Sequence, residues 1–277
     1  MIPKIIHQTW RDEALPAEFR AYQRSWQEHH PGWAYRFYDD RACRALVRDH
    51  YPALLALYDA CPHPVQRADI FRYLAVAHYG GLYADLDMEC YRPMDGLMAG
   101  ASCVFGIEVR LAPRRARLLG LRHAERIANC IFAAEADHPL FARIIEALQR
   151  IPSTDALARE VIGTTGPGML TDVVQAHRQE CPVRVLPQIC WLPPTRPDYP
   201  NRFPFNLHMY AKHHFAGTWK SALAPGEQGA VPKGPGGAWT FLRALVRRLP
   251  GPLEWFYLLP PSPVWPEDLL FLRKIGS

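Results

Sequence analysis

The 277-residue sequence has seven scattered cysteines but no C-X-X-C pair, so neither a disulfide framework nor a zinc finger is expected. A reducing compartment is the simpler interpretation. The sequence has no run of about 18 uncharged apolar residues, so no membrane-spanning helix is expected. No basic segment followed by a long apolar one opens the chain, so we also expect no signal peptide. The basic residues form no long cluster and no recognised motif, and nucleic-acid binding is therefore not expected.

What is present is the composition of a protein with a core. Hydrophobic residues make up 49% and charged residues 21% of the chain, which is typical of a globular protein rather than a disordered one. The 32 basic and 27 acidic residues give a formal net charge of +5. This mild positive balance suits phosphate-rich or membrane partners.

Segments with strand and helix patterns alternate along most of the chain. We expect strands over residues 4–9, 33–38, 82–89, 103–108, 183–186 and 209–213. We expect helices over residues 16–29, 41–49, 53–60, 65–79, 121–134, 140–150 and 166–176. The alternation predicts an α/β layered domain with a largely parallel central sheet.

The composition changes towards the C-terminal part of the sequence. We expect a main domain over residues 1–222, a Gly/Pro-rich linker over 223–238 and a tail over 239–277. In the tail, arginines are interleaved with apolar and aromatic residues at helical spacing, which is typical of a helix in a lipid headgroup layer. The alternative is that these apolar residues pack on the main domain, because several prolines interrupt any long helix.

The strongest chemical signal is a pair of aspartates in an apolar segment. Residues 82–89 alternate strictly, so we expect Tyr83, Asp85, Asp87 and Glu89 to share one face of a strand. Two carboxylates on one face can hold a hard divalent cation such as Mg²⁺ or Mn²⁺. Aspartates inside an otherwise apolar strand are unfavourable without such a role.

The preceding helix carries an acid and a base on one side. Asp69, Arg72 and Tyr73 are spaced i, i+3 and i+4, so their side chains are neighbours on the helix. Alone, the Asp69–Arg72 pair could be a surface ion pair. The pair comes before a Gly-Gly break and the strand that carries the aspartates, and this combination indicates a functional polar cluster.

These segments resemble the sugar-binding region of the family 32 glycosyltransferases, which contains a DXD motif. The likeness extends beyond Asp85-Leu86-Asp87 and covers roughly residues 2–220. The other matching blocks occur in the family's order: Ile2-Pro3-Lys4-Ile5-Ile6-His7-Gln8-Thr9-Trp10, His30-Pro31-Gly32-Trp33 with Asp39-Asp40, Asn129 before His138-Pro139, Thr165-Gly166-Pro167-Gly168, and Tyr210-Ala211-Lys212-His213-His214 with Trp219.

The resemblance implies a GT-A (Rossmann-like) catalytic domain that binds a nucleotide diphosphate sugar and Mn²⁺ or Mg²⁺. It implies a hexosyltransferase, retaining in mechanism, that uses a UDP- or GDP-sugar and a glycan or lipid-linked acceptor. Synthesis of a surface polysaccharide or glycolipid of the bacterial type fits this activity. The enzyme would then be cytoplasmic and peripheral on the inner face of the cytoplasmic membrane, and the tail would contact membrane or acceptor.

The resemblance also assigns roles to residues. For the nucleotide sugar it implies Gln8, Thr9, Trp10, Asp69, Arg72, Tyr83, Asp85 and Trp219, with Lys220 beside them. For catalysis it implies Asp85, Asp87, Arg72 and Asn129, the last on the helix expected over 121–134. For the metal it implies Asp85 and Asp87 with a late imidazole, either His213 or His214.

Other interpretations of the same residues stay open. Gln8 and Thr9 could satisfy backbone groups at a strand end, the two late histidines could be ordinary strand residues, and Asn129 could be an exposed helix residue. Glu108, at a strand end, is a candidate acceptor base. Two other classes of protein also fit the motif, a DxD-type metal-dependent phosphohydrolase and a noncatalytic membrane-peripheral binding module.

Overall fold

The computed structural model describes residues 1–118, 120–159, 161–193 and 208–217. Trp219, Lys220, the linker expected over 223–238 and the tail over 239–277 lie outside these residues, and the predictions made for them stay predictions. Among the described helices, none is both long and apolar enough to cross a membrane.

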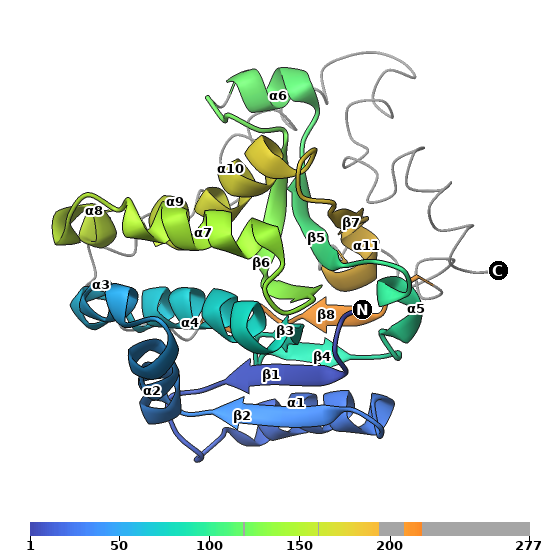
Figure 1. The fold of residues 1–277 in the computed structure, drawn as a ribbon. Helices are drawn as coiled ribbons and strands as arrows, with labels where there is room; N and C mark the ends of the chain where they lie inside the picture. The colour runs from blue at the N-terminus through green and yellow to red at the C-terminus, as the bar shows by residue number, and fades with distance from the viewer. Residues whose placement is uncertain (119, 160, 194–207, 218–277) are drawn as a thin grey trace, which may run out of the picture. The chain divides into compact units, whose positions relative to one another are not determined.

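A six-stranded sheet forms the centre of the fold, in the order β2-β1-β3-β6-β5-β7 (Figure 1). Its strands, in chain order, are β1 (Ile5–Thr9), β2 (Ala34–Tyr38), β3 (Gly81–Ala84), β5 (Cys103–Arg110), β6 (Glu125–Ala134) and β7 (Arg184–Leu186). β1 pairs in parallel with β2 and β3, and β5 with β7. β6 is antiparallel to both of its neighbours. In this sheet β6 alone is reversed, and the predicted α/β class with a mostly parallel sheet is confirmed.

Helices cover both faces of the sheet. They are α1 (Ala17–His29), α2 (Asp40–His50), a 3-10 turn η1 (Pro52–Leu54), α3 (Leu55–Ala60), α4 (Pro64–Tyr79), α5 (Asp95–Met98), α6 (Pro113–Leu118), α7 (Pro139–Gln149), α8 (Thr154–Arg159), α9 (Val161–Thr164), α10 (Pro167–His177) and α11 (Gln188–Trp191). α4, α7 and α10 share one core with one face of the sheet. α1, α5 and α11 share a second core with the other face.

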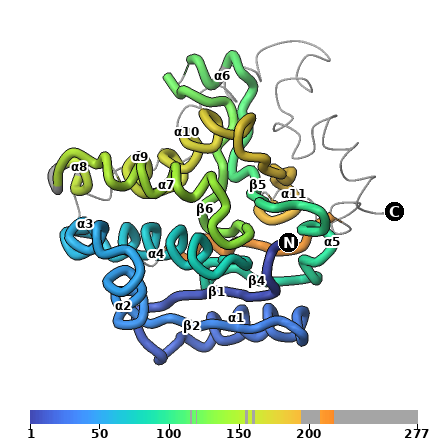
Figure 2. Tube along the Cα trace, in the orientation of Figure 1, coloured from blue at the N-terminus to red at the C-terminus, as the bar shows by residue number. Residues whose placement is uncertain are grey.

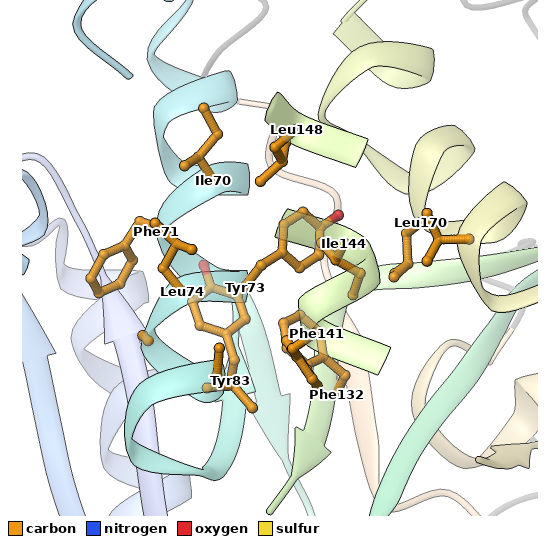
Figure 3. Close-up of a cluster of buried hydrophobic side chains, with 14 of the residues drawn as sticks. Ile70, Phe71, Tyr73, Leu74, Tyr83, Phe132, Phe141, Ile144, Leu148 and Leu170 are labelled. Atoms are coloured by element: carbon orange, nitrogen blue, oxygen red, sulfur yellow. The ribbon is translucent and has the colours of Figure 1, made fainter. Parts of the chain in front are cut away.

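The helix α4 is the central element of the larger core. It starts with Pro64 at its first turn and a capping box between His63 and Gln66, and Gly80 ends it. Its side chains, among them Phe71 and Tyr73, are buried around almost the whole circumference, as expected of a helix without a polar face. Figure 3 shows Tyr73 among Tyr83 of β3 and the side chains of β6 and α7, whereas Phe71 lies on the opposite side of α4, where it meets Tyr38.

The helix predicted over residues 121–134 is wrong, because this segment forms the strand β6. Residues 127–134 are buried without a break, since helices cover both faces of the sheet here. A strand buried on both faces shows no alternation, and a short apolar run of this kind cannot be told from a buried helix by its period.

The single strand predicted over residues 82–89 is also wrong. β3 ends at Ala84, the chain turns through Asp85–Asp87, and a separate strand β4 (Met88–Cys90) follows. β4 pairs antiparallel with β8 (Ala211–His213) in a small second sheet, the β4–β8 ribbon. The two aspartates therefore lie in a turn between two sheets, and strand alternation is not what brings them together.

Candidate active site

A pair of glycines sets the start of β3 against β1. Gly80 and Gly81 have φ values of 63° and 101°, which side chains disfavour. A Cβ on Gly81 would stand 2.6 Å from the carbonyl oxygen of Ile5. The Gly80 carbonyl accepts a hydrogen bond from Nε2 of buried His7 at 2.8 Å. This close approach of backbones fixes where β3, and so the DXD turn, begins.

The DXD turn is held from both sides by its backbone. The Asp85 N–H donates to the Cys130 carbonyl at 2.8 Å, and Met88 N–H donates to the Asp85 carbonyl at 3.0 Å. Between the two aspartates, Leu86 is 3% exposed and belongs to a small core with residues of the chain near α1. Burying a leucine contributes about 2 kcal/mol, so Leu86 anchors the turn with its carboxylates on the other side.

A third residue joins the two aspartates from far along the chain. One ligand atom from each of Asp85, Asp87 and His213 lies within 4.8 Å of the other two. Pairing of His213 with Met88 in the β4–β8 ribbon brings the histidine there. Its Nε2 lies 3.0 Å from Oδ1 of Asp87, and the Ala216 N–H donates to Oδ2 of Asp87 at 2.9 Å.

Of the two candidate histidines, the structure places His214 away from the aspartates. Its Nε2 lies 2.8 Å from Oε2 of Glu89, and its ring stacks on Tyr22 at 4.2 Å between centroids. Successive residues in an extended strand point to opposite sides, which separates His213 from His214. The structure thus places His213, and not His214, beside Asp85 and Asp87, and binding of a metal by His213 stays a prediction.

Arg72 of α4 lies behind Asp85. Its side chain is 5% exposed, and its Nη2 is 3.0 Å from Oδ1 of Asp85. Its Nη1 is 3.2 Å from Oδ1 of Asp69 and donates to the Asn129 carbonyl at 3.0 Å. The Tyr83 hydroxyl donates to the same Asp85 oxygen at 2.7 Å. Asp85 is therefore held in one orientation by a buried cation and a phenol.

Asp69 has both carboxylate oxygens engaged inside the protein. Asn129 Nδ2 donates to Oδ1 at 2.9 Å, and Thr165 Oγ1 donates to Oδ2 at 3.0 Å. Burial raises the pKa of Asp69 to about 6, against the opposing effect of Arg72. Asn129 reaches this point from the strand β6 and not from the expected helix, which corrects its position. We call Asp69, Arg72, Asp85, Asn129 and Thr165 the arginine cluster.

The residues after β1 approach the DXD turn from another side. Gln8 is fully buried, and its Nε2 donates to the Asp85 carbonyl at 3.2 Å while its Oε1 accepts from the Tyr35 hydroxyl at 2.8 Å. The Thr9 hydroxyl donates to the Tyr38 carbonyl at 2.8 Å. Both residues thus satisfy structural hydrogen bonds here, and their contact with a nucleotide stays a prediction.

Trp10 is the residue at this strand end that retains an unused donor. Its ring meets Phe19 edge-on at 4.9 Å, and its buried Nε1 has no hydrogen-bond partner among the described residues. Glu108 is bound through both oxygens to Arg126, at 2.8 and 3.1 Å, which disfavours it as an acceptor base.

Sequence reasoning missed several members of the site. Thr165 was noted only within a glycine-containing block, although its side chain binds Asp69 and is fully buried. Tyr35 and the Ala216 amide were not considered. The sequence signal for Thr165 is its position directly before the Gly166-Pro167 helix entry, whereas a backbone amide such as that of Ala216 leaves no mark in a sequence.

The donor chemistry of this group fits a divalent cation. Two carboxylates and an imidazole are ligands that Mn²⁺ accepts, and the carboxylates also suit Mg²⁺. Burial alone would lower the pKa of His213, but the neighbouring Cys130 thiol and the Asp87 carboxylate raise it to about 11. Burial raises the pKa of Asp85, and Arg72 opposes this. The imidazole therefore carries a proton beside Asp87, and a divalent cation would bind to this group with release of that proton.

Residues 16–103 match the family described as "Glycosyltransferase sugar-binding region containing DXD motif". This segment runs from α1 to the start of β5 and includes Arg72, Asp85 and Asp87. The chain thus carries a sugar-binding region of the glycosyltransferase type.

Fungal mannosyltransferases are among the curated proteins that the chain resembles. It is 32% identical over 183 residues to inositol phosphoceramide mannosyltransferase 2 of Schizosaccharomyces pombe, which covers 66% of this chain and 49% of the relative. It is 24% identical over 287 residues to the initiation-specific alpha-1,6-mannosyltransferase of Candida albicans, with 80% and 73% covered. The chain is homologous to these enzymes and spans about half the length of the first of them.

Among solved structures, the PaToxG glycosyltransferase aligns with a TM-score of 0.47 at 18% identity, over 65% of this chain and 70% of that one.

Proposed function

We propose that this protein transfers a hexose, with mannose the first candidate, from a nucleotide diphosphate sugar to an acceptor hydroxyl in a metal-dependent reaction on a GT-A type domain. The observation that carries the proposal is the convergence of Asp85, Asp87 and His213 within 4.8 Å beside buried Arg72. The match of residues 16–103 to a DXD-containing sugar-binding region supports the same assignment.

Asp85, Asp87 and His213 would hold Mn²⁺ or Mg²⁺. Such a cation supplies charge stabilisation for the diphosphate that departs with the nucleoside. Asp87 is suited to this because His213 and the Ala216 amide lower its pKa below the usual range although burial raises it. The carboxylate therefore stays ionised at neutral pH and keeps its ligand oxygens deprotonated.

The arginine cluster would preorganise the sugar side of the site. Arg72 and Tyr83 fix Asp85 before any ligand arrives, so little reorganisation is needed during reaction. We propose that Asp69 acts on the sugar through Arg72 and Asn129, because its own oxygens already accept bonds from Asn129 and Thr165. Retention of the anomeric configuration, as the resemblance implies, is part of the proposal.

The donor and acceptor are proposed from the relatives. Both fungal relatives are named mannosyltransferases, which favours GDP-mannose over UDP-sugars as the first donor to test. The name of the first also mentions inositol phosphoceramide, which favours a lipid-linked acceptor over a soluble glycan. We further propose a location on the inner face of a cytoplasmic membrane and a role in glycolipid or surface polysaccharide synthesis.

The test is turnover of sugar nucleotides by the full chain. GDP-mannose, UDP-galactose and a UDP-N-acetyl sugar are each incubated with and without Mn²⁺, and release of nucleoside diphosphate is measured. We expect one donor to be turned over, and chelation of the metal to abolish the reaction. Binding without an acceptor is measured separately as a rise in Tm with donor and Mn²⁺, since a ligand of the native state stabilises it.

The variant Asp87→Asn should lower turnover by about 10²-fold or more, because a metal ligand matters at least as much as the residues that orient one. Asp49→Asn is a matched control, since Asp49 is an exposed partner of Arg48. Full activity of Asp87→Asn, or release of phosphate from phosphomonoesters instead of nucleoside diphosphate, would contradict the proposal.

A further inference from the structure

The connection between β5 and β6 carries a surface that the candidate active site does not use. Residues 109–124 contain five arginines and no acidic residue. Within them α6 (Pro113–Leu118) lies at the outer end of the β5–β6 pair, as Figure 2 shows. We call residues 110–123 the α6 arm.

The tip of the arm exposes aliphatic side chains. Leu118 is 79% and Leu121 49% exposed, and they are two of the five large hydrophobic residues found exposed in the described part of the chain. Burying a leucine side chain stabilises a protein by about 2 kcal/mol, and an exposed leucine lacks this stabilisation. Two exposed leucines at one tip therefore favour a surface that contacts an apolar partner.

The backbone of the tip is ordered by a helix C-cap. Gly120, at a φ of 66°, donates its N–H to the Arg117 carbonyl, and the Leu121 N–H donates to the Ala116 carbonyl at 3.0 Å. This pair of bonds is the Schellman motif, which requires a residue such as glycine in the left-handed region. The cap ties Leu121 back to α6, the helix that carries Leu118.

The stem of the arm is braced on both sides. Arg110 pairs with Glu125 at 2.8 Å across the two strands. Arg122 and His123 both bind the Asp172 carboxylate of α10, at 2.8 and 2.9 Å. The exposed leucines are therefore presented by a supported projection of the fold.

Charge at the tip is of one sign. Arg114 and Arg117 are exposed on α6 next to Leu118, at positions i, i+3 and i+4 that share one face of a helix. The segment has arginines around exposed leucines and no carboxylate. It is therefore complementary to a partner whose surface is anionic and whose interior is apolar.

The arm emerges at the edge of the sheet that carries the candidate active site. β3 and β5 run in the same direction, each antiparallel to β6. The carboxyl end of β3, where Asp85 follows, and the carboxyl end of β5, where the arm begins, therefore belong to the same edge. A surface docked on the arm would lie on the side of the sheet from which substrates reach the DXD turn.

We propose that the α6 arm docks the protein on an anionic lipid bilayer, with Arg114 and Arg117 at the headgroups and Leu118 and Leu121 in the boundary beneath them. A bilayer fits better than a soluble polyanion, because a polyanion would neutralise the arginines but leave the two leucines in water. This docking needs no transferase activity, so it can be tested whether or not the proposed reaction is correct.

The first test reports on the arm itself. All seven cysteines are buried, so a cysteine introduced by Leu118→Cys in the full chain can be labelled selectively with an environment-sensitive fluorophore. We expect a blue shift with vesicles that contain phosphatidylglycerol and none with pure phosphatidylcholine. The same label at Arg143→Cys on α7 should not respond. Vesicle binding without a shift at position 118 would assign binding to another part of the chain and overturn the proposal.

The second test separates charge from apolar contact by vesicle flotation. Arg114→Gln with Arg117→Gln should weaken binding to anionic vesicles about tenfold to thirtyfold, because each arginine near such a surface contributes several-fold. Leu118→Ser with Leu121→Ser should weaken it about tenfold, with an unchanged Tm, because both side chains are exposed.

Arg143→Gln with Arg150→Gln removes the same charge from exposed side chains of α7 and its end, and should bind like the unaltered chain. Equal loss in this control would reduce the effect to net charge and overturn the proposal. So would tight binding of soluble polyphosphate together with an unaltered response of the leucine variant, since the partner would then be an anionic polymer.

Discussion

The two halves of the candidate active site are built in opposite ways. The arginine cluster comes from α4, the turn after β3, β6 and the entry to α10, and its polar atoms bind one another beside the main core. The β4–β8 ribbon has only two strands, whose paired residues stand far apart in the chain, as Met88 and His213 do. The first half is complete once the central sheet has formed. The second depends on a late segment returning to the DXD turn.

This difference separates the residues that orient Asp85 from those that bind the ligand. In the arginine cluster, Asp85 is already fixed by Arg72 and Tyr83, so mutations there should affect folding as well as chemistry. In the ribbon, His213 pairs with one carboxylate, that of Asp87, whereas Arg72 pairs with two, so the loss of His213 should affect ligand binding more than stability. Variants in the two halves should therefore differ in what they lose.

Arg72→Leu should lower the free energy of unfolding by about 3–5 kcal/mol, because it leaves the buried Asp69 carboxylate and the partly buried Asp85 carboxylate without their cation. The measurement is urea denaturation. Arg48→Leu, which breaks an exposed pair with Asp49, should leave the free energy of unfolding nearly unchanged. Similar losses of unfolding free energy in both variants would mean that the arginine cluster contributes no more to stability than an exposed ion pair.

Acid should weaken the side of the fold that carries β1 and β3. Burial lowers the pKa of His7 to about 4, although its bond to the Gly80 carbonyl opposes this. The unfolded chain takes up this proton below about pH 6.5, whereas the folded chain does so only near pH 4. Stability is therefore lost as the pH falls through this window, by about 3 kcal/mol in total.

Urea denaturation at several pH values checks this. The His7→Gln variant should be less stable at pH 7 but should show a flatter pH dependence than the unaltered chain. An equal slope in both proteins would show that His7 is not the group responsible.

His213→Ala should raise the Mn²⁺ concentration needed for half-maximal turnover by about 10²-fold, since it removes one of three converging ligand groups. His214→Ala should change this concentration less than about fivefold, because its ring binds Glu89 and Tyr22 instead. His214→Ala should unfold at nearly the Tm of the unaltered chain, whereas His213→Ala leaves Asp87 without its partner and should lower the Tm, though less than Arg72→Leu does. The reverse ranking of the two histidines would contradict the geometry of the ribbon.

Thr165→Val should have the smallest effect. It removes one hydrogen bond to Asp69 and should cost about 1–2 kcal/mol of stability. Thr165→Ser, which retains the hydroxyl, is the matched control. If Thr165→Val lowers turnover without lowering stability, Thr165 contacts substrate and is not only a support for Asp69.

The sequence allowed the α/β class, most elements and the central residues of the site to be predicted. Two signals together predicted α4: apolar residues at three- and four-residue spacing, and the glycines at which the helix ends. It failed for β6, where burial on both faces removes the alternation that marks a strand. Asn129 was therefore assigned to a helix, although its role beside Asp69 needs the extended backbone of β6.

The geometry of the DXD turn could not be read from alternation either. The pattern of residues 82–89 fits a strand, and the bend at Asp85–Asp87 arises from tertiary contacts of Leu86 and of the β4–β8 ribbon. The choice between His213 and His214 likewise depends on the register of pairing with β4, which no local pattern encodes.

Leu86 gives the middle position of the motif a task of its own. Its aliphatic side chain packs into the small core beside α1, while Asp85 is held by Arg72 and Asp87 lies beside His213. A polar side chain at this position would be buried among apolar residues, which is unfavourable without a hydrogen-bond partner. The turn would then shift to expose that side chain to water. The middle position of this protein's D-X-D motif is therefore restricted to apolar residues. A polar substitution there should displace Asp85 and Asp87 although neither aspartate is itself changed.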